Sequence, residues 1–285
     1  MNSPSALLHA TEKLEGLPAI PVIAQKILAL KIAEDACERA LLELIENDPL
    51  ILSRIIGLSN SALFGIGKKI LSLPDAAALL GSKRIRMISL SFAMMSSLPR
   101  KNAGLFNINS FWQHSLSIAM TMETLVSFMP DDLRPSEDEV YLAGLLHNIG
   151  FLVLDYVDPE LSNKFHACVS TQPENPVGEI EMEIIGTSHC DLGAALGHHW
   201  ELPESIISVI RHHHSVQANS VFIRQPLVAI AILAEKLLPT FGKNKTALKE
   251  IDPDDWLALG IDPAKADQIM AKAQHHIAEA AAILS

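Results

Sequence analysis

Cysteine is scarce in this chain, and its placement argues against a disulfide framework. The 285 residues include three cysteines, Cys37, Cys168 and Cys190, which lie far apart and are odd in number. We therefore expect reduced, mostly buried thiols in a cytoplasmic protein, because disulfides are rare where thiols are kept reduced. The spacing of the three cysteines matches no nucleophile or redox motif.

Long uninterrupted apolar runs are also missing, although the chain is apolar overall. Hydrophobic residues make up 49% of the chain and the mean hydropathy is +0.24. Even so, runs such as PLVAIAILAEKLLP are too short or too interrupted to span a bilayer. The N-terminal sequence MNSPSALLHATEKLEG has no basic region leading into an apolar run, so no signal peptide is indicated. We expect no membrane partner and enough apolar material for a large core.

Positive charge is in short supply. The net charge is −11 and the isoelectric point about 5.5, which argues against nucleic acid as a partner because phosphate binding needs an electropositive surface. One basic cluster, Lys83, Arg84 and Arg86 with Lys68 and Lys69 upstream, is open to two interpretations. It is either a local anion contact or a solvated helix face, and we favour the second.

Strand-like alternation and hairpin turns are absent from the sequence pattern, whereas helix starts recur. Asp48, Asp252 and Asp262 each precede a proline, which places an aspartate at the N-cap and a proline at the first helical position. Ser136 and Glu139 have the spacing of a capping box. The sequence therefore predicts an all-α fold.

Two polar segments interrupt the apolar helices. Residues 98–110 are rich in glycine and asparagine, and residues 129–139 form an acidic stretch that contains proline. We take the first segment as a boundary and the second as an internal loop. This division predicts an N-terminal helical lobe over residues 1–105, packed on a histidine-bearing lobe over 106–240, with a C-terminal helical extension over 241–285.

Histidine is concentrated in one part of the chain, because nine of the 12 histidines lie between residues 114 and 214. Several fall on apolar helix faces; His114, for example, shares the face of Phe111 and Ile118 at helical spacing. Glu235 lies on an equally apolar face, an unusual place for a carboxylate. A single histidine in such a place is usually a core residue with a hydrogen-bond partner. The ordered set is what favours a metal site: His114, His147, Asn148, His189, His212, His213 and Glu235.

These residues occur in segments that resemble a known superfamily. FWQHSLSIA, YLAGLLHNIG, GTSHCDLGAALGHHWELPESIISVIRHHH and AIAILAEKL resemble, in order, the landmarks of HD-superfamily metal-dependent phosphohydrolases. Earlier segments, LPAIPVIAQKILAL, ENDPLILSRIIGLSNSALFG and SLPDAAALLGSKRIRMISLS, resemble the HDOD branch, the HD-related output domains of bacterial signalling proteins. The resemblance runs from about Leu14 to about Leu238. It implies an HDOD-type all-helical fold and a regulatory role, usually without demonstrated catalysis.

Asn148 departs from the pattern of the catalytic HD proteins. In those proteins an aspartate follows the histidine, binds metal and bridges both ions of a two-metal site. A neutral amide does not readily bridge two cations. Five imidazoles and Glu235 around two dications would leave a charge of about +3, which a partly buried site holds poorly. We therefore expect one divalent transition ion, Zn²⁺, Fe²⁺, Mn²⁺ or Ni²⁺, at most.

Asn60 and Ser61 in the segment LSNSALFG form a second polar anomaly. Asn60 lies on the apolar stripe of Leu52 and Ile56. One interpretation is a contact with a ligand or partner. The other, which we favour, is an amide that satisfies backbone groups at the end of a helix.

Together these features predict a cytoplasmic HDOD-type signalling or regulatory protein that binds signalling partners through a helical surface and has no hydrolase activity. The alternative is a metal-dependent phosphohydrolase acting on a nucleotide or another phosphate ester. No GYP tripeptide follows the His147-Asn148 pair, so the cyclic-dinucleotide branch is not supported. Apart from Arg211, no lysine or arginine lies in the histidine motifs to clamp a phosphate.

Overall fold

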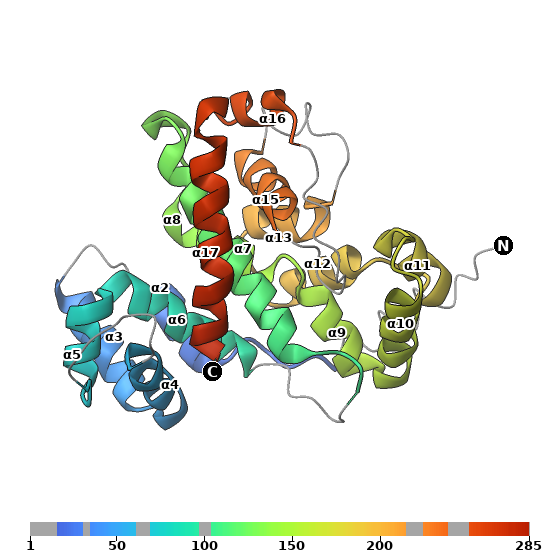
Figure 1. The fold of residues 1–285 in the computed structure, drawn as a ribbon. Coiled ribbons are helices and arrows are strands. Elements are labelled where there is room, and N and C mark those ends of the chain that lie inside the picture. The colour runs from blue at the N-terminus through green and yellow to red at the C-terminus, as the bar shows by residue number, and fades with distance from the viewer. Residues whose placement is uncertain are drawn as a thin grey trace. The chain divides into compact units, whose positions relative to one another are not determined.

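The computed structural model is helical wherever it describes regular structure. The residues it describes are 16–30, 35–60, 69–96, 104–214, 225–238 and 251–284. They divide into two compact units, one within residues 18–99 and one formed mainly by residues 100–280 (Figure 1). These are referred to as the N-terminal unit and the histidine unit. No strand occurs among the described residues, and the all-α prediction is confirmed.

The N-terminal unit begins its helices where the sequence predicts. Asp48 caps α4 by accepting hydrogen bonds from the backbone N–H groups of Leu50 and Ile51, and Pro49 follows at the first helical position. Gly81, at a φ of 81°, separates α5 from α6 in a conformation that residues with a side chain rarely adopt. The helices are α2 (Val22–Ala29), α3 (Asp35–Glu46), α4 (Pro49–Ser59), α5 (Leu73–Leu80) and α6 (Ser82–Met95).

Arg86 corrects the interpretation of the basic cluster as a solvated helix face. Its side chain is 4% exposed, whereas Lys83 and Arg84 are exposed as expected. The guanidinium of Arg86 donates to the carbonyl oxygens of Ile27 at 3.3 Å and Leu30 at 3.2 Å. A buried cation at the carboxyl end of α2 bonds the carbonyl groups of the last turn, where the helix dipole favours positive charge.

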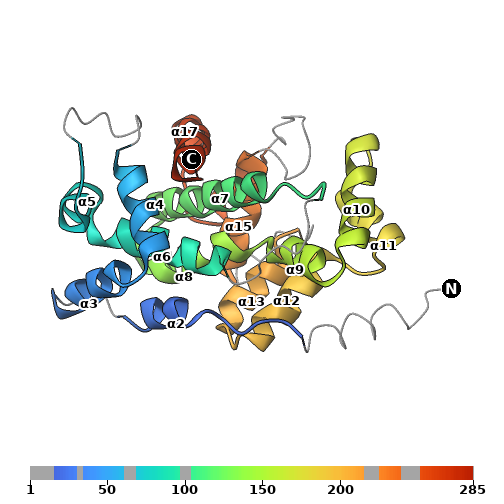
Figure 2. The same cartoon turned by 90° about the horizontal axis from the view of Figure 1, so that it is seen from below.

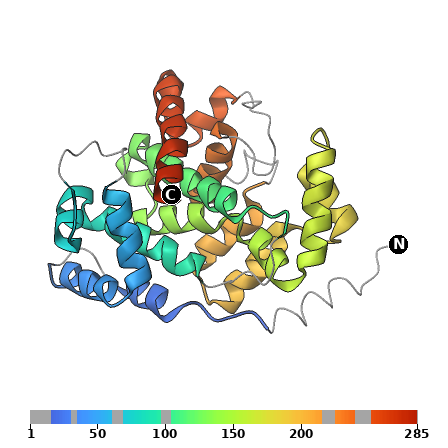
Figure 3. The same cartoon turned by 60° about the horizontal axis from the view of Figure 1, so that its bottom comes forward.

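The histidine unit is built around a long central helix, α7. It packs against α8 and α15, while α12 packs against α9 and α13 (Figure 2). At one edge of this unit α10 and α11 lie side by side (Figure 3). The helices are α7 (Ile108–Phe128), α8 (Glu137–Leu146), α9 (Ile149–Val157), α10 (Pro159–Thr171), α11 (Val177–Ile184), α12 (His189–His199), α13 (Glu204–His212), α15 (Pro226–Leu237), α16 (Pro253–Leu257) and α17 (Ala266–Leu284), with 3₁₀ turns η2 (Asp131–Leu133) and η3 (Pro263–Lys265).

The C-terminal helix α17 contacts α7 through polar groups. Gln113 Nε2 donates to the carbonyl oxygen of Ile277 at 3.3 Å. Thr124 Oγ1 lies 2.8 Å from His276 Nε2, and Nδ1 of the same ring lies 2.7 Å from Glu279 Oε2. As far as Ala280, α17 belongs to the same compact unit as the histidine-bearing helices.

Three sequence-predicted helix starts in this unit have mixed outcomes. Asp252 and Asp262 cap α16 and η3 through their side chains, as predicted. The capping box at Ser136 and Glu139 is wrong, because Ser136 lies at the N-cap of α8 without a side-chain cap bond. Glu139 accepts instead from Ser205 Oγ at 2.6 Å, which links α8 to α13.

Two glycines allow the close helix approaches that shape the histidine unit. A Cβ on Gly144 of α8 would lie 2.5 Å from the Cα of Ala119 on α7. A Cβ on Gly150 of α9 would lie 1.8 Å from the carbonyl oxygen of His189 on α12. Both distances are far shorter than van der Waals contact, so α8 and α9 reach these positions only because the two residues lack a side chain.

No single helix of the described residues is long and apolar enough to cross a membrane. Helices α8 and α9 would pass that test only as a pair, and they are bent by 41° at the break between them. The prediction of mostly buried thiols holds for Cys190 alone, since Cys37 and Cys168 are half-buried.

Candidate metal centre

His147 and Asn148 lie at the break between α8 and α9. Helix α8 ends at Leu146 and α9 begins at Ile149, so the pair belongs to neither helix. His147 is fully buried and Asn148 is 2% exposed. The break allows both consecutive side chains to point into the interior of the unit, where an uninterrupted helix would turn them about 100° apart.

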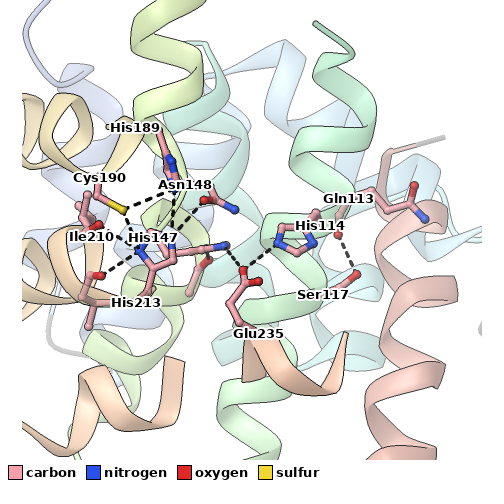
Figure 4. A network of polar contacts seen from close by, with 12 residues as sticks. Gln113, His114, Ser117, His147, Asn148, His189, Cys190, Ile210, His213 and Glu235 are labelled. Carbon is pink, nitrogen blue, oxygen red and sulfur yellow. Dashed lines mark hydrogen bonds and ion pairs between the residues drawn. The ribbon is translucent and has the colours of Figure 1, made fainter. Parts of the chain in front are cut away.

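The first group of candidate ligands is His114, His147 and Glu235, called here the Glu235 group. His114 comes from α7 and Glu235 from α15, and these side chains meet His147 in the interior (Figure 4). His114 Nε2 donates to Glu235 Oε1 at 2.9 Å, and His147 Nε2 lies 2.8 Å from the same oxygen. One carboxylate oxygen therefore faces two imidazoles in a place that is nearly closed to water.

Backbone contacts determine which nitrogen of His147 carries the proton. Nδ1 donates to the carbonyl oxygen of Gly144 at 2.7 Å, so the neutral ring is unprotonated at Nε2. Nε2 is buried and has no aligned hydrogen bond, although it lies so close to Glu235. The lone pair of this nitrogen faces a carboxylate oxygen, an arrangement that a cation between the two atoms would stabilise.

The pKa values of His147 and Glu235 favour a neutral imidazole beside an ionised carboxylate. Burial lowers the pKa of His147 below its ordinary value, and the contacts with Glu235 offset this only in part. Burial alone would raise the pKa of Glu235, but the charge and hydrogen bond of His114, together with His147, hold it well below its usual range. A neutral His147 thus faces an ionised Glu235.

The second group is His189, His213 and His214, called here the His189 group. His213 donates from Nδ1 to the carbonyl oxygens of Val209 at 3.1 Å and Ile210 at 3.0 Å. Its Nε2 is therefore the atom that faces the interior, 3.3 Å from His189 Nε2 and 3.2 Å from Asn148 Oδ1. Burial, together with the neighbouring His214, His147 and His189 rings, holds the pKa of His213 well below its usual value.

Glu181 of α11 orients His189. Its Oε1 accepts from the Nδ1 of His189 at 2.5 Å and from the backbone N–H of the same residue at 3.1 Å. Phe151 stacks on the ring with centroids 4.1 Å apart. Burial lowers the pKa of His189, but the adjacent Cys190 sulfur and the Glu181 carboxylate outweigh burial and raise it to about 10. A carboxylate behind a histidine is the usual support of a metal ligand, because it fixes the tautomer and the ring orientation.

The structure brings most of the sequence-predicted site residues together and leaves one out. His212 is half-buried at the end of α13 and belongs to neither group, whereas its neighbour His214 belongs to the second. Glu181, which is 2% exposed, is a further residue that the sequence analysis missed. The sequence did not single it out, because EIEMEII carries glutamates at three alternate positions. The residues brought together are His114, His147, Asn148, His189, His213 and Glu235.

Asn60 and Ser61 lie apart from this centre. Asn60 belongs to the N-terminal unit and ends α4. Its Nδ2 donates to the carbonyl oxygens of Ile56 and Ile70 at 2.8 and 2.7 Å, and its Oδ1 accepts from the Ile70 N–H at 2.8 Å. The amide satisfies backbone groups at the end of a helix, which is the interpretation that the sequence analysis favoured. The residue is exposed and not buried. Ser61 lies outside the described residues.

Comparison with known proteins places the chain in a family. Residues 17–216 match the family model of the HDOD domain. The chain belongs to the HDOD family. The match covers both the N-terminal unit and most of the histidine unit, and it confirms the resemblance found in the sequence motifs.

Solved structures show the same HDOD helical fold at low sequence identity. They include an HDOD domain protein of unknown function from Geobacter sulfurreducens, at 24% identity and a TM-score of 0.66, covering 95% of this chain and 98% of that one. A candidate signal transduction protein from Marinobacter aquaeolei VT8 has 23% identity and a TM-score of 0.74, over 95% of this chain and 58% of that one. A candidate phosphohydrolase from Shewanella amazonensis SB2B has 21% identity and a TM-score of 0.71, over 97% and 98%.

A curated relative matches this chain over only part of its own length. It is an uncharacterized protein of Treponema pallidum (strain Nichols), 24% identical over 214 residues. The match spans 72% of this chain but 39% of the relative. This chain thus matches less than half of the length of that relative.

Proposed function

We propose that this HDOD protein is a cytoplasmic regulator that holds a divalent transition ion at the Glu235 group and acts by binding signalling partners. Zn²⁺, Fe²⁺, Mn²⁺ and Ni²⁺ all suit imidazole and carboxylate ligands. The ion would join α7 and α15, which carry His114 and Glu235, to His147 directly after the end of α8. Hydrolysis of a phosphate ester is not part of the proposal.

The observation that carries the proposal is the buried Nε2 of His147. It lies 2.8 Å from an ionised carboxylate oxygen with its proton on the opposite side of the ring. Two facing lone pairs in a site of 0% and 9% side-chain exposure are unfavourable unless a cation lies near both. His114 Nε2, 2.9 Å from the same oxygen, becomes a third ligand atom once an ion displaces the proton that it donates to Glu235.

Two features favour a regulator over a hydrolase. Asn148 is neutral at the position where catalytic relatives need a bridging carboxylate, and its amide oxygen faces His213 rather than Glu235. In the sequence segments around the His147-Asn148 pair and around His212 to His214, Arg211 alone could hold a phosphate, and its side chain is exposed. The site can therefore bind a cation but has no evident means to stabilise the extra charge of a phosphoryl transition state.

Metal analysis of protein purified without chelators tests the proposal. We expect at least one equivalent of a divalent ion in the wild-type chain, and a melting temperature that falls when a chelator removes it. His147→Ala should lose both the ion and the chelator sensitivity. His275→Ala, which changes an exposed histidine on α17, is the matched control and should keep both.

A hydrolysis assay decides between the two functions. Bis(4-nitrophenyl) phosphate with added Mn²⁺ should be cleaved no faster by the wild-type protein than by His147→Ala. A metal-dependent rate that disappears in His147→Ala would support the phosphohydrolase instead. A wild-type chain that carries no metal and gains no stability from any would contradict the proposal.

A further inference from the structure

A cavity in the histidine unit lies away from the metal centre, and the proposed function gives it no role. Its volume is about 360 Å³ and it is partly open to solvent. The residues that line it come from the N-terminal ends of α8, α13 and α15 and from Pro135, just before α8. These three helices pack against one another, so the cavity lies where they begin.

The buried part of the lining is apolar and the exposed part is acidic. Leu227 and Val228, at the start of α15, line the cavity and are 6% and 1% exposed. Glu139, which is half-buried, and Glu204, which is exposed, also line it. Among the described residues of the lining there is no lysine or arginine. Two carboxylates without a neighbouring cation repel an anion and favour a positively charged ligand.

Glu139 is already oriented by the protein. Its Oε1 accepts a hydrogen bond from Ser205 Oγ at 2.6 Å, which ties the carboxylate of α8 to α13. Within the described part of the chain Ser205 is its hydrogen-bond partner, and an ionised carboxylate has lone pairs for more than one donor. An ammonium group in the cavity can therefore bind Glu139 without breaking the contact with Ser205.

The size of the cavity indicates an organic cation and not a metal ion. Its volume lies within the range of about 300–1,000 Å³ that is usual for small-molecule sites. A hydrated ion would lose water against the apolar surface of Leu227 and Val228 and gain no hydrogen bonds there. A molecule that carries an ammonium group on a short hydrocarbon body suits both parts of the lining.

The same three helices lead from the cavity to the metal centre. His147 follows the last residue of α8, His213 follows the last residue of α13, and Glu235 lies in the last turn of α15. With a helical rise of about 1.5 Å per residue, the cavity and these side chains are about 10–12 Å apart along the helices. A ligand that holds the helices together at one end therefore also affects the geometry at the other end.

We propose that this cavity is an effector site for a small organic cation. Its ammonium group binds at Glu139 and Glu204, its apolar part contacts Leu227 and Val228, and its binding increases the metal affinity of the Glu235 group. The effect on metal rests on the proposed function, because it requires an ion at the Glu235 group. Binding of the cation itself does not depend on metal.

Three probes of similar size and different charge test the ligand class by calorimetric titration of the full chain. They are 4-phenylbutylamine, 4-phenylbutan-1-ol and 4-phenylbutyrate. The amine should bind most tightly and the carboxylate least. Glu139→Gln keeps an oxygen that accepts from Ser205 but loses the charge, and it should weaken amine binding by about 10-fold. Glu160→Gln, at an exposed position of α10, is the matched control and should bind the amine as wild type does.

A second variant tests whether the cavity is the place of binding. Ser208 lines the cavity, so Ser208→Phe should fill it and abolish amine binding. Retained binding in Ser208→Phe, or equal binding of the amine and the carboxylate, would overturn the inference. Glu139→Gln and the comparison of probes still decide the matter if Ser208→Phe fails to fold.

Metal titrations with and without saturating amine test the effector role. The amine should raise the metal affinity of the wild-type chain by about 5-fold or more and leave that of Ser208→Phe unchanged. Amine binding without any change in metal affinity would overturn the effector role and leave the proposed function standing. A chain that binds no metal would overturn the proposed function and the effector role together, while the amine titration still shows whether the cavity accepts a cation.

Discussion

Individual side chains in the centre are oriented by groups that do not touch the proposed ions. The Nδ1 atoms of His147 and His213 donate to backbone carbonyls, and that of His189 donates to Glu181. In each ring the Nδ1 proton is thereby held on the side that faces away from the centre. This common arrangement supports metal binding more strongly than any single contact, because all three rings direct Nε2 toward the centre.

Asn148→Asp tests whether the pair at the helix break is an altered metal site. Without metal, the new carboxylate is buried beside a neutral His213, and we expect a loss of about 1–3 kcal/mol of unfolding free energy. Mn²⁺ should restore stability, because the added charge lies where an ion needs it. Thermal melts with and without Mn²⁺ measure the effect.

The matched control for this change is Asn60→Asp. It should also destabilise the protein, since Asn60 would lose the two hydrogen bonds that its Nδ2 donates to backbone carbonyls. Metal should not restore that loss. If the Asn148→Asp loss is equally insensitive to metal, His147 and Asn148 are ordinary core residues.

Glu181→Gln tests the orientation of His189. The amide keeps the size of the side chain but removes the charge that supports the ring, and we expect metal affinity at the His189 group to fall by about 10- to 100-fold. Competition with a chromophoric chelator measures the change. Glu183→Gln, at an exposed position of the same helix, should leave affinity unchanged. Equal affinities in the two variants would exclude a role for Glu181 in metal binding.

The helices meet closely enough to form the centre because glycine stands at two contacts. Gly144 lies three residues before His147, and Gly150 lies two residues after Asn148. These contacts hold α8 against α7 and α9 against α12. The break that carries the His147-Asn148 pair is therefore bracketed by two positions at which a side chain would push the helices apart.

Gly150→Ala should be strongly destabilising. Its Cβ would lie 1.8 Å from the His189 carbonyl oxygen, so α9 and α12 must separate, at a cost of about 1–3 kcal/mol or more. The same shift should weaken metal binding at the His189 group. Gly178→Ala, in a helix of the same unit where nothing lies within 4 Å, should cost no stability. Urea denaturation of both variants provides the comparison, and an equal effect would refute the close-contact argument.

At the scale of the whole molecule, the buried histidines of the centre make the free energy of unfolding depend on pH. The metal-free native chain keeps His147 and His213 neutral below their ordinary pKa of 6.5. The unfolded chain binds protons there that the native chain does not, so stability falls as the pH drops below that value. His189 acts in the opposite sense, because its pKa is raised to about 10. Its contribution is complete below pH 6.5 and is lost as the pH rises through about 10.

We therefore expect the chelator-treated protein to be most stable near neutral pH. On the acid side each neutral buried histidine should contribute a slope of up to about 1.4 kcal/mol per pH unit. His213→Gln removes one of them and should make the fall between pH 6.5 and 5 less steep. Urea denaturation at several pH values provides the measurement, and an unchanged slope would show that His213 is protonated in the native chain.

The sequence by itself determined the helical class, three of the N-caps and the order of the ligand-bearing segments. These features depend on local chemistry. An aspartate before a proline caps a helix regardless of how the helices pack, and the spacing of apolar residues identifies a buried face. The capping box at Ser136 failed because a tertiary contact with Ser205 recruited Glu139.

Tertiary structure alone decided which histidines and acids meet. Helical spacing could not choose among His212, His213 and His214, because it does not show where α13 ends, and the helix stops at His212. Glu181 reaches His189 across the turn between α11 and α12, and the sulfur of Cys190 lies beside two imidazoles from different helices. Contacts of this kind depend on how far helices approach one another, and the packing of the whole unit determines that distance.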